Sequence, residues 1–151
     1  MTKAQQVSFY IYALLSFAGI LGGMLYIVTP DVMPYHLEAI GIPWSALPAG
    51  TRDLLRVMVK LIGGVTILFS GTIMTLLLVP FRKSEPWAIV TVAVTGAFYN
   101  AMGLAAALYI RHTTGARTPW IFGIVSLTLV IIAGIVSLSG MRQRGNRVQR
   151  A

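Results

Sequence analysis

The 151-residue chain contains no cysteine, and this absence removes a whole group of functions. Disulfides, thiol redox chemistry, thiolate metal sites and haem attached through thioethers all require a cysteine side chain. Charged residues are also scarce, at 11% of the sequence against about 25% in an average soluble domain. With 56% hydrophobic residues, the composition predicts a membrane protein.

Only four residues are acidic, and none of them lies deep inside an apolar segment. Proton-coupled transporters usually place an acidic side chain within a membrane span, so a small-solute transporter is the weakest of the candidate functions. The sequence also lacks a phosphate-binding glycine loop and a Ser-His-Asp set in a catalytic context. We therefore expect no catalytic residues and no enzymatic activity.

Four long apolar runs fill most of the chain and leave no room for a separate soluble domain. Each run approaches or exceeds the roughly 20 residues that a helix needs to cross a bilayer. We expect one domain over residues 1–151, an all-α membrane protein whose four spans form a four-helix transmembrane bundle. The expected helices cover residues 8–28, 52–80, 86–111 and 119–141, followed by a basic tail over 142–151.

The segment 29–50 holds four of the seven prolines and therefore cannot be one continuous helix. Residues 34–40 are expected to form a short helix that Gly41 closes. Tyr35 and Trp44 suit the headgroup layer, where an aromatic ring keeps its body in lipid and its polar atom hydrated. We expect this segment to cap the bundle at the membrane interface, between the first two spans.

The formal net charge of +8 could indicate nucleic-acid binding, but the basic residues lie at the ends of the apolar runs. This placement is typical of membrane topology, so we expect no nucleic-acid partner. Seven lysines and arginines lie on the side of the two termini, against five on the side of residues 29–50. The positive-inside rule then predicts that both termini are cytoplasmic.

Asp53, Arg56 and Lys60 follow one another at helical spacing at the start of the second expected span, on a stripe that continues into Gly63 and Gly64. A cation near the hydrocarbon boundary must extend toward water, pair with an acid or bind an anionic group. Extension toward water with internal pairing is the simpler interpretation. A quinone carbonyl or a lipid phosphate bound by Arg56 and Lys60 is the alternative.

Asn100 is the strongly polar residue farthest from any helix end, and it shares a helix face with Gly96 and Gly103. Its amide must find partners within the hydrocarbon layer, so it is expected to face the bundle interior. A hydrogen bond to Thr66 or Ser70 of the second span is the simpler role, and a cofactor site is the alternative. Tyr99 could then donate a hydrogen bond to a quinone.

His36 and His112 lie in connections on the same side of the expected bundle. Together with Met33, Asp31 or Glu38 they are weak candidates for a metal site outside the cytoplasm. No two of these residues have a recognisable ligand spacing on one helix, so no metal is expected.

Three glycines at positions 19, 22 and 23 give the first span a face of small residues that another helix can approach closely. Packing within the chain is favoured over dimerisation, because a four-helix chain needs such faces internally.

The stretch HLEAIGIPWSALPAGTRDLLRVMVKLIGGVTILFSG resembles the central part of the DoxX-like family of small four-span bacterial membrane proteins. The matching positions are Gly41, Pro43, Gly63 and Gly64, and the four-span layout also fits. Lys60 departs from the family pattern, because an acidic residue often precedes the glycine pair there. The resemblance implies residence in the bacterial inner membrane, and in some members an association with oxidoreductases that deliver electrons to quinone.

Taken together, these observations favour an accessory or structural subunit of a larger membrane complex, or a homo-oligomer. Its expected partners are membrane lipids and other membrane-protein subunits or copies of itself. The alternative is a quinone- or lipid-binding component of a membrane oxidoreductase, with quinone as its cofactor. In that case Arg56, Lys60, Tyr99 and Asn100 would surround the ligand.

Overall fold

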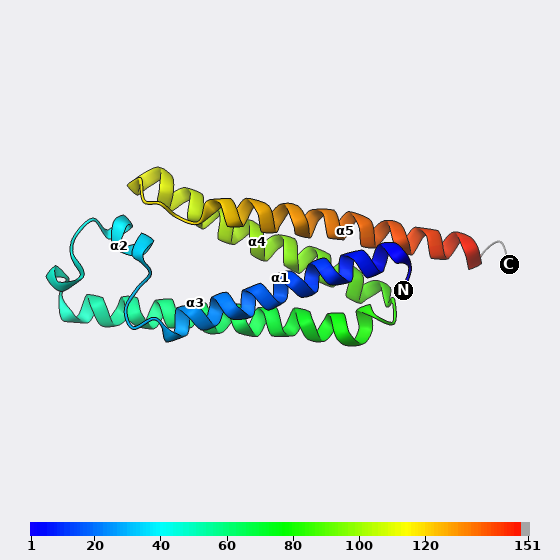
Figure 1. Cartoon of the computed structure of the whole chain (residues 1–151), viewed down its shortest axis with the longest axis horizontal. Helices are drawn as coiled ribbons and strands as arrows, with labels where there is room; N and C mark the ends of the chain where they lie inside the picture. Colours follow the sequence, from blue (N-terminus) through cyan, green and yellow to red (C-terminus); the bar gives the residue numbers. More distant parts are fainter. Residues whose placement is uncertain (149–151) are drawn as a thin grey trace.

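The computed structural model describes residues 1–148, including the side chains of residues 1–141, and all its regular elements are helical. The long helices α1 (Lys3–Val28), α3 (Ala49–Leu76), α4 (Pro86–Thr114) and α5 (Trp120–Val148) run alternately in opposite directions (Figure 1). The short helix α2 (Pro34–Ile40) and a 3-10 turn, η1 (Trp44–Ala46), connect α1 to α3. A π-helical turn, η2 (Leu77–Phe81), extends α3. The expected all-α bundle is confirmed.

Four helical segments are long and apolar enough to cross a membrane: Lys3–Val28, Ala49–Phe81, Pro86–Thr114 and Trp120–Met141. Their outward faces carry large exposed apolar side chains, among them Phe17, Leu68, Phe98 and Ile135. In water so much exposed apolar surface would drive aggregation, whereas in a bilayer it contacts lipid. The chain is therefore a multi-pass membrane protein.

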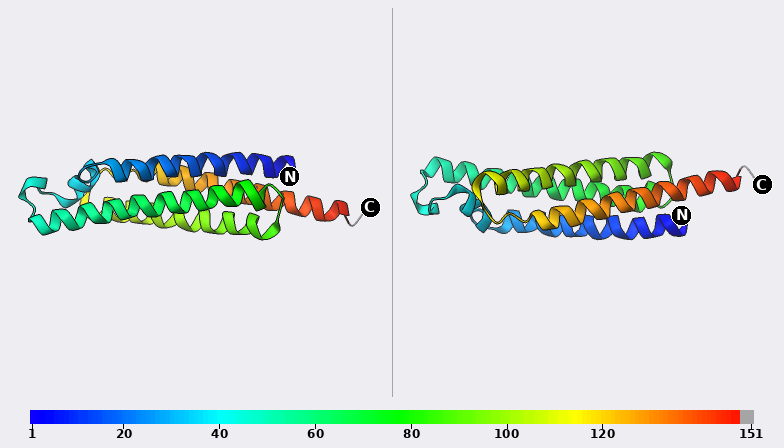
Figure 2. Two further views of the ribbon diagram at one scale, coloured as in Figure 1. Left: turned by 90° about the horizontal axis from the view of Figure 1, so that it is seen from below. Right: turned by 90° about the horizontal axis from the view of Figure 1, so that it is seen from above.

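The four long helices associate as two pairs, α1 with α3 and α4 with α5, and α1 also packs against α5. The start of α1 and the end of α5 lie at one end of the bundle, and α2 lies at the other (Figures 1 and 2). Contact between α3 and α4 is sparse. The two pairs thus approach each other near the chain ends and separate toward α2.

The apolar core lies where the two pairs meet. It contains Tyr12, Ile73, Leu77, Phe81, Ile89, Val92, Val130 and Ala133. Two side-chain hydrogen bonds join α1 to α5 there, from Ser8 Oγ to the Ala133 carbonyl oxygen at 2.8 Å and from Tyr12 Oη to the Val130 carbonyl oxygen at 3.3 Å. A buried hydroxyl bonded to a backbone oxygen fixes the relative position of two apolar helices, because the unbonded state is costly in hydrocarbon.

Helices α1 and α3 cross through glycine. A Cβ atom added at Gly23 would lie 2.7 Å from the Gly63 carbonyl oxygen, and one added at Gly63 would lie 2.7 Å from the Gly23 carbonyl oxygen. Gly19 similarly lies directly against Ser70, whereas a Cβ at Gly22 would meet nothing within 4 Å. The prediction that glycines of the first span pack within the chain is therefore confirmed at Gly19 and Gly23.

Helix α1 begins five residues earlier than expected. Thr2 Oγ1 accepts a hydrogen bond from the Gln5 backbone N–H at 3.2 Å, and Gln5 Oε1 accepts one from the Thr2 N–H at 2.9 Å. This reciprocal capping box lets a polar segment enter the helix, because it satisfies two backbone donors that would otherwise lack partners.

The other boundaries differ by a few residues. Helix α3 begins at Ala49, three residues before the expected start, and Pro48 is its N-cap residue. Pro80 lies within η2, so the helix passes it before turning. Helix α4 continues to Thr114, where Gly115 closes it with a φ of 74°, and α5 continues to Val148 through most of the expected basic tail. Residues 149–151 of that tail lie outside the described residues.

Ser84 does not cap α4 as its sequence position suggests. It adopts a left-handed conformation with a φ of 60°, and Glu85 is the N-cap residue. The Ser84 Oγ instead donates a hydrogen bond to Gln5 Oε1 at 3.0 Å. The turn between α3 and α4 is thereby tied to the start of α1.

Candidate functional site: an internal cavity between the helix pairs

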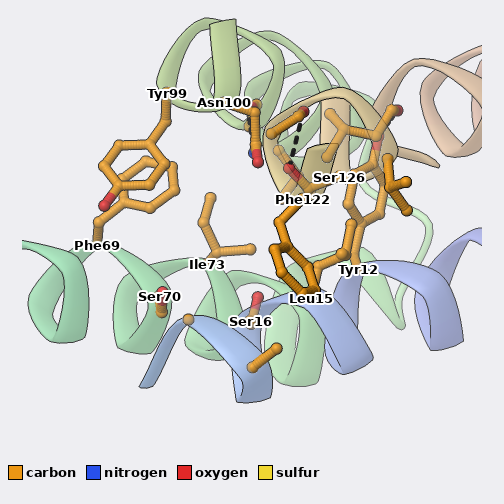
Figure 3. A pocket seen from close by; sticks show the side chains of 17 residues that line it. Tyr12, Leu15, Ser16, Phe69, Ser70, Ile73, Tyr99, Asn100, Phe122 and Ser126 are labelled. Carbon is orange, nitrogen blue, oxygen red and sulfur yellow. Dashed lines mark hydrogen bonds between the residues drawn. The ribbon is translucent and has the colours of Figure 1, made fainter. Parts of the chain in front are cut away.

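A cavity of about 360 Å³ begins where the two helix pairs separate, and all four long helices line it. Most of its lining is apolar, with Leu15, Phe69, Ile73 and Phe122 prominent among the side chains (Figure 3). Its volume falls within the range of about 300–1,000 Å³ that is usual for small-molecule sites. The separation of two helix pairs in this one chain therefore creates a space of ligand size.

Asn100 and Tyr99, both proposed from the sequence, line this cavity. The Asn100 Nδ2 donates a hydrogen bond to the Gly96 carbonyl oxygen at 2.8 Å, on its own helix. Since a carbonyl oxygen can only accept, the amide nitrogen must face Gly96, which leaves Oδ1 directed elsewhere. Asn100 faces the bundle interior as expected, but it does not bond to Thr66 or Ser70.

Tyr99 closes the side of the cavity between α3 and α4. Its Oη lies 2.7 Å from Thr66 Oγ1, and its ring stacks on Phe69 with the ring centroids 4.1 Å apart and the planes 13° from parallel. Thr66 also donates to the Ile62 carbonyl oxygen, so in the pair with Thr66 it is the tyrosine that donates. These contacts join two helices that otherwise touch little.

Ser16 of α1 and Ser70 of α3 are the polar residues on the opposite wall, with only 6% and 4% of their surface exposed. From the sequence, Ser70 was expected only as a partner for Asn100, and Ser16 was not singled out. A serine in an apolar helix gives little signal, because its hydroxyl usually bonds to the carbonyl one turn earlier. Neither hydroxyl makes such a bond among the described residues.

Arg56 and Lys60 do not line the cavity; they hold the connection between α1 and α3 in place. The Arg56 guanidinium bonds to Asp31 at 2.7 Å and to Asp53 at 3.2 Å, and it lies over the Trp44 ring. Lys60 Nζ donates to the Ile27 carbonyl oxygen at 2.7 Å and to that of Thr29 at 3.4 Å. A cation there binds the unpaired carbonyls at the α1 C-terminus, where the helix dipole is negative.

The two histidines do not gather with other candidate metal ligands among the described residues. Across the described chain, no group of three or more His, Cys, Asp or Glu residues lies close enough to hold a metal ion. His36 Nδ1 accepts a hydrogen bond from the Met33 N–H at 3.3 Å, and its ring packs against Tyr35. Burial lowers the pKa of His36 from its ordinary value of 6.5. His112 is exposed in the last turn of α4.

The segment with α2 spans the open end of the bundle and touches both helix pairs. The Tyr26 and Tyr35 hydroxyls are hydrogen-bonded, which joins α2 to α1. On the other side, Glu38 Oε2 accepts a hydrogen bond from the Arg117 backbone N–H at 2.9 Å, in the loop between α4 and α5. Gly41 ends α2 with a φ of 76°, a conformation that glycine adopts without strain.

Fold and cavity together define a class: a four-span helical membrane protein with a mainly apolar cavity between its helix pairs and a short helix at one end of the bundle. No family model matches the sequence, and no match was found among the curated proteins or the solved structures.

Proposed function

We propose that this membrane protein binds a small, mainly apolar molecule of the lipid or quinone type between its two helix pairs. The cavity is the observation that supports this function. Natural binding sites combine apolar walls with a few polar groups that orient the ligand, and the cavity has both. Tyr99 and Asn100 remain ligand-contacting candidates, whereas Arg56 and Lys60 support the cap.

This proposal treats the protein as a DoxX-like binding component of a membrane oxidoreductase, in the bacterial inner membrane. The component itself is non-catalytic. The resemblance carried by Gly41, Pro43, Gly63 and Gly64 supports the assignment. Two of these glycines have structural roles in the fold: Gly41 ends α2, and Gly63 lies at the crossing of α1 and α3.

The test is to purify the protein in a mild detergent, extract it with organic solvent and identify what is released by mass spectrometry. We expect one compound at near-stoichiometric amount from the wild type. Ser126→Phe, which fills the cavity, should lose it, because a large side chain would occupy the binding volume. Ser139→Phe is the matched control, since Ser139 is exposed on the same helix.

If the Ser126→Phe protein carries the same compound as the wild type, the molecule binds elsewhere and the assignment of the cavity is wrong. If solvent releases nothing stoichiometric and no added lipid or quinone stabilises the protein, the proposed function is wrong as a whole.

A second candidate is an accessory or structural subunit that associates with another membrane protein or with its own copies. It is supported by the C-terminal half of α4, which exposes a series of small residues: Ala101, Gly103, Ala105 and Ala106. Small exposed residues let helices approach closely in lipid. The same purification separates the two candidates, because this one requires a stoichiometric polypeptide or a defined oligomer.

A further inference from the structure

Hydroxyl groups in the membrane-spanning part of α3 generally bond to their own helix. Thr66, Thr72 and Thr75 each donate to the carbonyl oxygen four residues earlier, at 2.8, 2.8 and 2.9 Å. The bond satisfies a polar group that would otherwise lack a partner in hydrocarbon. Ser126, which lines the cavity, bonds in a similar way to the Gly123 carbonyl oxygen at 3.1 Å.

Ser16 and Ser70 depart from this pattern. Both are more than nine-tenths buried, both line the cavity, and neither hydroxyl has a hydrogen-bond partner among the described residues. In Figure 3 both serines lie on the wall across the cavity from Asn100, and the Ser70 Oγ lies against Gly19, which also lines the cavity. A hydroxyl without a partner is unfavourable in apolar surroundings. Two such donors at one site indicate that a molecule in the cavity supplies the acceptor.

The cavity offers no charge to its occupant. None of the described side chains that line it is charged. Arg56 and Lys60, in the first turns of α3, are bonded to carboxylates and to helix-end carbonyls instead. An ionised head group placed there would lose its hydration without gaining an ion pair, which is strongly unfavourable. The polar end of the occupant must therefore be neutral.

The cavity can be reached from the lipid on one side. The side between α3 and α4 is bridged by the stacked pair Phe69 and Tyr99. On the side between α1 and α5, the lining residue Phe122 is 78% exposed and Ala18 is also exposed. Because these exposed residues face the surroundings of the bundle, an apolar chain that begins in the cavity can extend past them into the bilayer.

We infer that the cavity recognises an uncharged carbonyl group attached to an apolar chain, with Ser16 and Ser70 donating hydrogen bonds to the carbonyl oxygen. This inference rests on the proposed function and adds the chemistry of the ligand's polar end. An ester or amide lipid and a quinone share this chemistry. A fatty-acid carboxylate or a phosphate head group does not.

The experiment measures the thermal unfolding midpoint of the delipidated protein in detergent. The probes are a long-chain fatty-acid methyl ester, an isoprenoid quinone, and the matching free fatty acid at about pH 9, where its carboxyl group is ionised. We expect the ester, the quinone or both to raise the midpoint in a saturable way, and the carboxylate to leave it unchanged. Comparing the rise in the midpoint caused by the ester with that caused by the quinone identifies which of the two supplies the carbonyl group.

The double variant Ser16→Ala and Ser70→Ala should bind the stabilising probe about tenfold more weakly or worse, because both hydrogen bonds to the ligand are lost. It should fold, because alanine is the best helix former and the two unpaired hydroxyls are removed. Ser139→Ala is the matched control, because that hydroxyl is bonded to its own helix outside the cavity, and this variant should bind as the wild type does.

This inference is overturned if the carboxylate stabilises the protein as much as the other probes do, or if the double variant binds the probe as the wild type does. In either case, a compound that is still extracted with the protein leaves the proposed function intact. If no probe stabilises the wild type and no compound is extracted, the proposed function fails and this inference fails with it.

Discussion

Gly23 and Gly63 let α1 and α3 contact each other through their backbones, with no side chain between them. Around this crossing, side chains from one helix bind backbone groups of the other, as Lys60 does at the end of α1. Ser16 and Ser70 lie on these same two helices, so the crossing also fixes the distance between the two unpaired hydroxyls. Single small residues thus set the shape of the cavity wall.

Gly63→Ala tests this crossing. An added Cβ would lie 2.7 Å from the Gly23 carbonyl oxygen and 2.9 Å from the Tyr26 Cβ, so the helices must move apart. We expect a loss of about 1–3 kcal/mol of stability, seen as a lower thermal unfolding midpoint in detergent. Gly64→Ala is the control, because a Cβ there meets nothing within 4 Å and should gain up to about 1 kcal/mol of helix propensity. Equal effects of the two substitutions would contradict the role of the crossing.

The cap built around α2 is the element that joins the two helix pairs at their open end. It contacts α1 through Tyr35, and Glu38 contacts the loop before α5. Arg56 fixes the segment that precedes it through Asp31. Helix α2 has seven residues, none of them buried, so tertiary contacts must hold it in place. We expect it to be less stable than the long helices.

The stability of the cap should depend on pH through His36. Burial lowers its pKa in the folded protein below the ordinary 6.5, so the unfolded cap binds a proton first as the pH falls. Stability is therefore complete above about pH 7, decreases as the pH falls through 6.5, and stops decreasing below the pKa of the folded state. Protonation also removes the acceptor for the Met33 N–H.

Hydrogen exchange of the α2 amides between about pH 7 and pH 5, corrected for the intrinsic exchange rate, measures this change. We expect protection to fall with acidification in the wild type and to be independent of pH in His36→Gln. His112→Gln is the control, because His112 is exposed. An unchanged pH dependence in His36→Gln would mean that another group titrates.

At the scale of the whole molecule, the bundle is asymmetric along its length. The end with the chain termini holds the apolar core and the bonds from Ser8 and Tyr12 to α5. The cavity lies next to this core, with which it shares Tyr12, Ile73, Val92 and Val130, and α2 lies at the opposite end of the bundle. Both ends of the chain lie on the first side (Figure 1), which agrees with an even number of spans.

The orientation of this asymmetric bundle can be measured because the chain has no cysteine to interfere. We expect a cysteine at Lys83, on the side of the termini, to be protected from a membrane-impermeant maleimide in intact cells. A cysteine at His112, on the cap side, should be labelled. The reason is the larger number of lysines and arginines near the termini. Reversed labelling would place the cap and the open end in the cytoplasm.

Much of the architecture could be predicted from the sequence because it depends on local patterns. Apolar runs of membrane length predicted the four spans, and prolines predicted the break between the first two. Gly41 was correctly placed as the end of α2, because left-handed closure of a helix has a strong local preference for glycine. Helix ends were less accurate, as with α1, which begins at Lys3 and whose Gln5 is bonded to the distant Ser84.

The candidate site was predicted only in part. Asn100 could be placed in the interior, since a lone amide in an apolar helix must avoid lipid. The pairing of Arg56 with acidic residues was the simpler interpretation of the sequence and is found in the structure, whereas the helix-end carbonyls bound by Lys60, 31 and 33 residues away, could not be derived. The sequence alone thus determined a four-span membrane protein, through hydrophobicity and helix-breaking residues. The tertiary structure decided where the helix pairs separate, because the point of separation depends on which small residues meet across helices. This separation leaves Ser16 and Ser70 facing the cavity without partners.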